Sequence, residues 1–142
     1  MLMPSSGLVS GGGLLVGPTQ PAADGVLRLV DLVGVPAAGA LAENTFTAVN
    51  VGTAILGADG VSATAGVTTH DETEARTNHA MVTKAQQTVV VADGSKVGRV
   101  ALAQMTGLDR VSTLITDGSA DLAELERIQA AGVEVVVARA LP

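Results

Sequence analysis

The chain has 142 residues, 47% of them hydrophobic, and a formal net charge of −6 from 14 acidic and 8 basic side chains. This length can bury a sizeable core as one domain, and the acidic balance argues against nucleic acid as a partner of this chain alone. Cysteine is absent and Phe46 is the only aromatic residue, which excludes disulfides, thiolate metal sites and an aromatic platform for bases. No basic residue precedes Arg28 and no apolar run reaches the roughly 18 residues of a membrane helix, so the sequence predicts a cytoplasmic protein.

The N-terminal segment of the chain is its least regular part. Residues 1–25 hold many Gly, Pro and Ser residues and form either a strand followed by a glycine turn or a frayed end. Residues 26–142 are patterned, and we predict that they form a single α/β domain, present only in part. At its start, "VLRLVDLVG" has strand-like content, and Pro36 opens the Ala-rich segment 36–46, which is typical of a helix.

The middle of the chain alternates between strand and helix patterns. Residues 51–56 read as a buried strand, and residues 57–70 read as a long loop. Asp71 followed by Glu74 resembles a capping box at the start of a helix. Two sets of apolar and polar positions fit the helical spacing: Ala75, His79, Val82 and Gln86, or Ala75, Asn78, Val82 and Ala85.

The C-terminal part continues this alternation. Residues 88–92 and 112–116 are β-branched runs that predict buried strands, and residues 133–138 predict a closing strand. Between them, a helix over about 120–131 ends at Gly132, a good C-terminal cap. Its predicted apolar face comprises Leu122, Leu125 and Ile128.

Alternating strands and helices with near-continuously apolar strands predict the fold class. We expect an α/β protein in which helices cover both faces of a mainly parallel, Rossmann-like sheet, giving three α/β/α layers. In such sheets ligands bind beyond the carboxyl ends of the strands. The loops "GADG", "ADGSKVG" and "TDGS" all fall there.

These loops contain the candidate chemistry, and each has two interpretations. Asp-Gly pairs are common turn formers. Lys96, bracketed by Gly94 and Gly98, can meet an anionic ligand or can be a solvated surface lysine. Thr68 and Thr69 precede a helix, where they bind an anion or cap the helix, and capping is favoured. The two histidines match no standard metal site, so no metal or other cofactor is expected.

Several sequence blocks, taken together, resemble one family. "ILGADGV", "GVTTHDETEA", "AMVTKA", "VVVADGSKVG" and "LDRVSTLITD" occur in the order found in the C-terminal effector-sensing domain of DeoR-type bacterial transcriptional regulators. The resemblance covers residues 50–138 well and extends more weakly to "LVGVPAAGALAE" and "VSGGG". It implies a phosphosugar-isomerase-like fold, incomplete at the N-terminus, and a sugar-phosphate sensor related to ribose-5-phosphate isomerase.

The resemblance also implies a set of ligand-binding residues. In the isomerase family, an Asp-Gly-Ala-Asp loop and an Asp-x-x-Lys loop line the sugar-phosphate site. Matching these loops to "LGADG" and "ADGSK" makes Asp59 an acceptor for sugar hydroxyls and Lys96 a partner for anionic or hydroxyl groups. Glu74 lies near the position of the isomerase base, although we expect it to cap its helix. The implied ligand-binding residues are Asp59, Gly60, Thr68, Thr69, Lys96 and Gly98, with Gly57, Glu74 and Asp93 as further candidates.

The chain also departs from these families. Leu56 replaces the first Asp of the isomerase loop, which favours binding without turnover and a protein that is not an enzyme. No winged helix-turn-helix and no Asp-Ser-Gly-Ser/Thr-Thr phosphate loop is recognisable, so we expect a truncated sensor domain.

Three hypotheses follow from these matches and departures. The first is a sensor module that binds a phosphorylated sugar, forms homo-oligomers and contacts neither DNA nor membrane by itself. The second is a small sugar-phosphate isomerase. The third is an oligomerising remnant that binds no ligand.

Overall fold

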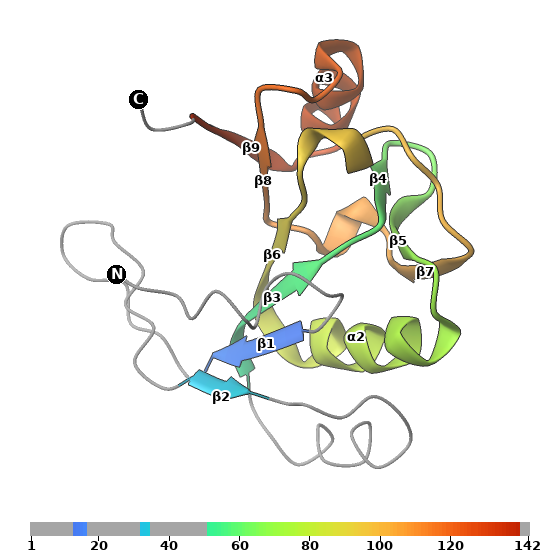
Figure 1. Ribbon diagram of the computed structural model, residues 1–142. Coiled ribbons are helices and arrows are strands. Elements are labelled where there is room, and N and C mark those ends of the chain that lie inside the picture. Colours follow the sequence, from blue (N-terminus) through green and yellow to red (C-terminus); the bar gives the residue numbers. More distant parts are fainter. Residues whose placement is uncertain (1–12, 17–31, 35–50, 140–142) are drawn as a thin grey trace, which may run out of the picture.

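The computed structural model describes residues 13–16, 32–34 and 51–139 (Figure 1). The helix predicted from Pro36 lies outside these residues, as does most of the segment 1–25. Among the described residues, no helix is long and apolar enough to cross a membrane.

A six-stranded sheet forms the centre of the described fold (Figure 1). Four neighbouring strands run parallel to one another, and the two strands at one edge are antiparallel to their neighbours. This confirms an α/β fold with a mainly parallel sheet. In spatial order the strands are β2 (Leu32–Gly34), β1 (Gly13–Val16), β3 (Val51–Gly57), β6 (Ala85–Val91), β8 (Thr113–Asp117) and β9 (Glu134–Ala138).

A second sheet has three antiparallel strands, two of which lie in the region 57–70 that was predicted as a loop. Its strands are β4 (Gly60–Ser62), β5 (Gly66–Thr69) and β7 (Ala103–Thr106), in that spatial order. The prediction of a loop was wrong because every residue of β4 and β5 is buried, so these short strands lack the apolar-polar alternation that marks a half-buried strand. Gly66 turns the hairpin with a φ of +70°.

Helix α2 (Glu72–Lys84) confirms the predicted N-terminal cap. The Asp71 carboxylate accepts hydrogen bonds from the backbone N–H groups of Thr73 and Glu74, at 2.8 and 3.2 Å. The helix ends before Gln86, which lies in β6. Of the two predicted faces, the one with Asn78 is buried and His79 is exposed.

Helix α3 (Leu122–Ala130) differs from the prediction on its apolar face. Leu125 and Ile128 are buried as expected, but Leu122 is 73% exposed and Glu124 is only 8% exposed. At about 100° per residue, Glu124, Leu125 and Ile128 span an arc of about 100°, and Leu122 lies outside it. The helix stops before Gly132, whose φ of +99° confirms its role as the cap.

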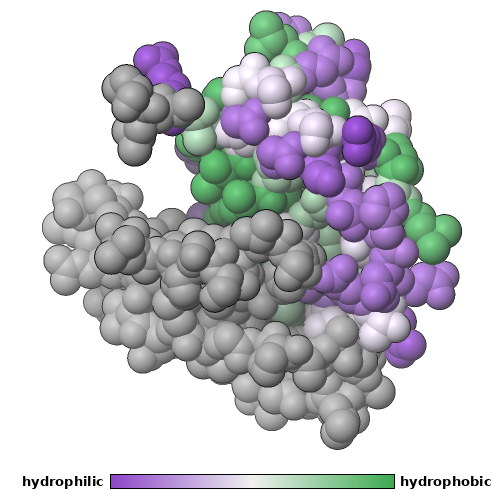
Figure 2. Space-filling view, viewed as in Figure 1, coloured by the Kyte–Doolittle hydropathy of each residue, from purple (hydrophilic) through white to green (hydrophobic). Residues whose placement is uncertain are grey.

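The core is aliphatic, as its composition predicts. Val67, Val90, Met105, Leu114 and Ile128 belong to one cluster that joins both sheets and α3. The sheet is not covered evenly, however, because Val136 and Val137 of β9 are 41% and 44% exposed. Figure 2 shows apolar surface over β8 and β9. Among the described residues, this edge of the sheet is therefore more exposed than the strands at its centre.

Candidate functional site

The carboxyl ends of β3, β6 and β8 meet at one edge of the parallel part of the sheet. Residues 58 and 59 follow β3, and the 3₁₀ helix η1 (Gly94–Lys96) lies just beyond β6. The antiparallel hairpin β4–β5 begins directly after Asp59, and a parallel bridge joins Val61 of this hairpin to Val97. Two of the three predicted loops are therefore neighbours in space.

Asp59 is held in place by the end of the β4–β5 hairpin. Its Oδ2 accepts hydrogen bonds from the Thr69 hydroxyl and the His70 backbone N–H, each at 2.9 Å. Its own backbone N–H donates to the Thr68 carbonyl at 3.0 Å. The His70 N–H, the Thr69 hydroxyl and the positive charge of Lys96 together lower the pKa of the Asp59 carboxyl. Asp59 is therefore an ionised acceptor in a fixed position.

Thr69 connects Asp59 to a second carboxylate. Its buried hydroxyl also lies 3.1 Å from Oε2 of Glu74. Burial raises the pKa of Glu74, and the nearby charges of Asp71 and Asp59 raise it further. The expectation that Glu74 completes a capping box is corrected, because its carboxylate lies against Thr69 while Asp71 caps the helix.

Lys96 completes this group from the other loop. It is half-buried at the end of η1, and no hydrogen bond or ion pair joins its side chain to another described residue, although its backbone N–H donates to the Asp93 carbonyl at 3.0 Å. The bridge between Val61 and Val97 holds the loop of Lys96 beside the Asp59 hairpin, and the positive charge of Lys96 makes a small contribution to lowering the pKa of Asp59. We name Asp59, Thr69, Glu74 and Lys96 the acid-lysine cluster.

Thr68 and Gly60 are both predicted to bind ligand. In this structure, they hold neighbouring backbone segments together. The Thr68 hydroxyl donates to the Gly60 carbonyl at 3.3 Å and accepts from the Ala101 N–H at 2.9 Å, and Thr68 is 2% exposed. A Cβ added at Gly60 would lie 2.4 Å from the carbonyl oxygen of Arg99. The predicted capping role of Thr68 and Thr69 is also corrected, because both lie in β5.

The other predicted glycines lie close by. Gly57 is the buried last residue of β3. Gly98 has a φ of +89° and donates its N–H to the Val61 carbonyl at 2.7 Å, which fastens the Lys96 loop to β4. These positions shape the loops around the acid-lysine cluster.

Asp93 and Asp117 form two similar turns at the ends of β6 and β8. Asp93 Oδ1 accepts the N–H of Ser95 at 2.9 Å and also the Ser95 hydroxyl. Asp117 Oδ1 accepts the N–H of Ser119 at 2.8 Å and also its hydroxyl. Hydrogen bonds from the Ser119 hydroxyl, the Ser119 N–H and the Gly94 N–H lower the pKa of Asp117. Both aspartates therefore act as turn formers here.

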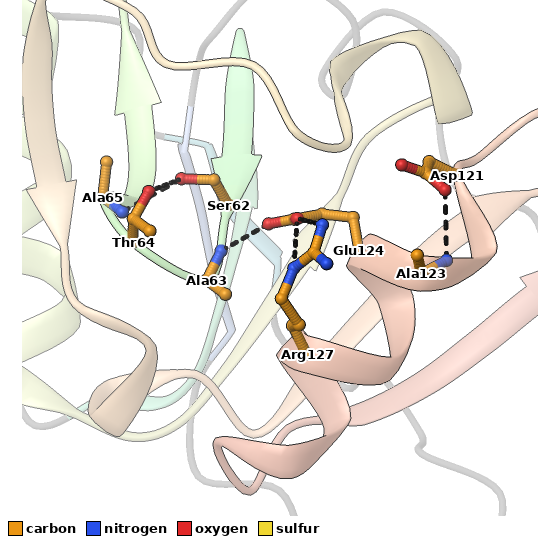
Figure 3. Close-up of polar contacts among 8 residues, drawn as sticks. All are labelled: Ser62, Ala63, Thr64, Ala65, Asp121, Ala123, Glu124 and Arg127. Carbon is orange, nitrogen blue, oxygen red and sulfur yellow. Dashed lines mark hydrogen bonds and ion pairs between the residues drawn. The ribbon is translucent and has the colours of Figure 1, made fainter.

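Glu124 is a structurally prominent residue that the sequence analysis did not identify. Glu124 reaches from α3 to the turn of the β4–β5 hairpin, where its Oε1 accepts the Ala63 N–H at 2.7 Å (Figure 3). Its Oε2 accepts from Arg127 Nε at 2.9 Å. This backbone N–H and the Arg127 side chain lower the pKa of Glu124. A glutamate three residues after an N-cap aspartate has the spacing of a capping box, as Glu74 has after Asp71, and this spacing does not indicate a contact with a distant hairpin.

An open groove lies elsewhere, between α2 and β7, with a volume of about 990 Å³. Its walls include Arg76, His79 and Gln104, and none of the predicted ligand-binding residues lines it. The His79 Nδ1 lies 2.9 Å from the Met105 carbonyl oxygen. Among the described residues, no group of three or more His, Cys, Asp or Glu side chains is placed to hold a metal ion.

Comparison with known families and proteins adds a second line of evidence. A family model described as the DeoR C terminal sensor domain matches residues 36–118. This span contains every predicted ligand-binding residue.

The chain is similar to parts of longer proteins. It is 40% identical over 98 residues to the HTH-type transcriptional regulator GlpR of Haloferax volcanii, covering 69% of this chain and 38% of that protein. It is 38% identical over 82 residues to an Escherichia coli O157:H7 protein named as an aga operon transcriptional repressor, covering 58% of this chain and 30% of that protein. The chain is 31% identical over 98 residues to the HTH-type transcriptional regulator YulB of Bacillus subtilis, covering 69% of this chain and 38% of that protein.

Proposed function

This chain belongs to the family of DeoR C-terminal sensor domains, and from that membership we propose that it binds a phosphorylated sugar as the effector of a transcriptional regulator. The effector-sensing unit would span residues 26–142. Its phosphosugar-isomerase-like, three-layer architecture is part of this proposal, as is its location in the cytoplasm.

The acid-lysine cluster is the observation that supports this function best. Asp59 and Lys96 come from different loops at the carboxyl ends of neighbouring parallel strands, where α/β sheets bind ligands. The ionised Asp59 carboxylate has one oxygen occupied by Thr69 and His70, and its remaining acceptor capacity suits sugar hydroxyls. Lys96, without a described partner, suits an anionic or hydroxyl group of the ligand.

The chemistry of the cluster favours binding over isomerisation. Leu56 stands where the resemblance to the isomerase places an aspartate, and its side chain is fully buried in the core. This position therefore provides neither a carboxylate nor a contact with a ligand. The relatives, moreover, are named as transcriptional regulators or repressors.

Signal transmission would follow from a shift between two conformations. An effector can shift such an equilibrium only by its difference in affinity for the two states. The partners we propose are the sugar phosphate and further copies of the chain, without direct contact of this chain with DNA or membrane. Which genes are regulated is a property of the whole regulator in which such a domain acts.

Thermal melting of the purified chain tests this function. We would compare ribose 5-phosphate and fructose 6-phosphate with ribose and with inorganic phosphate. A ligand present at 100 times its Kd adds about 2.7 kcal/mol to the free energy of unfolding, which raises Tm by several degrees. We expect such a rise with a phosphorylated sugar and a much smaller one with ribose.

Two matched variants locate the site. Lys96→Ala should abolish the rise, whereas Lys84→Ala, at the exposed end of α2, should preserve it. A rise that survives Lys96→Ala would place the ligand elsewhere. Conversion of ribose 5-phosphate to a ketose by the wild-type chain would replace the sensor with the isomerase hypothesis.

A further inference from the structure

Glu124 is the only buried carboxylate in the part of the chain that the structure describes. A buried charge is costly unless it is paired and hydrogen-bonded. Here both oxygens have partners, since Oε1 accepts the Ala63 N–H at 2.7 Å and Oε2 accepts from Arg127 (Figure 3). The Arg127 side chain is 58% exposed, so this ion pair joins a buried carboxylate to a guanidinium group that reaches solvent.

The hydrogen bond to Ala63 joins α3 to the hairpin that holds Asp59. Ala63 lies in the turn between β4 and β5, and the hairpin has only three residue pairs, from Ser62 opposite Gly66 to Gly60 opposite Thr68. The end of the hairpin opposite this turn carries Asp59 and Thr69. Because the hairpin is so short, a contact at its turn bears on the orientation of its other end, which the pairing of β5 with β7 also holds.

Glu124 also lies against the loop that carries Lys96. A Cβ added at Gly98 would lie 3.8 Å from Glu124 Cγ. Gly98 in turn donates its N–H to the Val61 carbonyl at 2.7 Å, and Val97 pairs with Val61. One side chain of α3 therefore contacts the turn of the Asp59 hairpin and adjoins the Lys96 loop.

We propose that Glu124 is a positioning residue that fixes the Asp59 hairpin and the Lys96 loop relative to each other, and so sets effector affinity without touching the effector. This inference rests on the proposed function, because the affinity in question is that of the acid-lysine cluster. Thermodynamic linkage makes the effect reciprocal, so that effector binding must also strengthen the contact between Glu124 and Ala63.

Amide hydrogen exchange of the full chain, read residue by residue, tests the contact directly. Glu124→Ala should raise exchange at Ala63 by at least about tenfold and should also raise it at Gly98, with less change at Met81 in α2, because openings are local. Glu124→Gln should restore much of the protection, because an amide oxygen can still accept from Ala63. Glu126→Gln, an exposed neighbour on the same helix, is the matched control and should change nothing.

Titration with ribose 5-phosphate and fructose 6-phosphate, measured on the same variants, tests the consequence. Glu124→Ala should weaken binding roughly 5- to 20-fold, within the range of ordinary coupling between sites. Glu124→Gln should fall between Glu124→Ala and the wild type. A purely structural role would lower Tm and speed exchange at all three amides alike, with unchanged affinity of the folded protein.

Each result decides the inference. Unchanged exchange at Ala63, equal increases at all three amides, or wild-type affinity in Glu124→Ala would overturn it. If Glu124→Ala does not fold, Glu124→Gln and Arg127→Ala take its place, with smaller increases expected at the same amides. A wild-type chain that binds neither sugar phosphate refutes the proposed function, whereas wild-type binding that Glu124→Ala leaves intact refutes only the positioning role.

Discussion

Two Asp-Gly-Ser turns end neighbouring parallel strands, and they share one local structure in two different environments. In both, the aspartate accepts the N–H and the hydroxyl of the serine two residues later. The turns differ at the glycine. A Cβ added at Gly94 would lie 2.2 Å from the backbone nitrogen of Ala120, whereas one added at Gly118 would meet nothing within 4 Å.

The residue that follows each turn differs as well. Lys96 follows the first turn, half-buried and within electrostatic reach of Asp59. Ala120 holds the equivalent place after the second turn and is buried in the core at 7% exposure. The comparison teaches that a local pattern determines the turn, while the neighbouring strands determine whether the residue after it packs in the core or presents a charged side chain.

Replacing the glycine of each turn with alanine should produce the largest difference in stability between the two turns. Gly94→Ala forces a methyl group against the backbone of the second turn, where nothing flexible can give way, and should cost about 1–3 kcal/mol or more. Gly118→Ala has open space and should change the free energy of unfolding by less than about 0.5 kcal/mol. Urea unfolding of both variants measures the difference. Equal losses would mean that the first turn does not pack against the second.

Replacing the aspartate of each turn should produce a smaller difference in stability between the two turns. The larger loss is again expected where the two turns contact each other. Asp117 accepts an additional hydrogen bond from the Gly94 N–H, so Asp117→Ala should lower Tm more than Asp93→Ala. The folded-state pKa of Asp117 lies below its ordinary 3.8, so its stabilisation is present above about pH 3.8 and is lost as pH falls through the folded value.

A pH series of thermal melts checks this second contrast. The Tm difference between the wild type and Asp117→Ala should be largest near neutral pH and should shrink as pH falls below about 3.8. A difference that is constant with pH would show that packing, and not the charge of Asp117, stabilises the turn.

Lys96→Ala should have the smallest effect on stability of the three. The side chain has no described hydrogen-bond or ion-pair partner, so the free energy of unfolding should change by no more than about 0.5 kcal/mol. Binding of a phosphorylated sugar should nevertheless be lost. A large drop in Tm without ligand would instead assign Lys96 a structural role.

The sequence alone determined the elements whose signals are local. The strands β3, β6, β8 and β9, the Asp71 cap of α2 and the Gly132 stop of α3 all follow from β-branched runs and capping residues. The family blocks identified the sensor family, and the resemblance implied Asp59 and Lys96 as ligand-binding residues, which stays a prediction.

Only the tertiary structure decided the features that depend on distant contacts. The antiparallel sheet of β4, β5 and β7 was not predicted, because the fully buried β4 and β5 show no alternation and β7 is only 4 residues long. Glu74 lies against Thr69 instead of closing its cap, and Glu124 faces inward where Leu122 was expected. Glu124 finds its partner in the β4–β5 turn, 61 residues earlier, and Glu74 finds its partner in the preceding strand β5. The spacing of residues within each helix records neither partner.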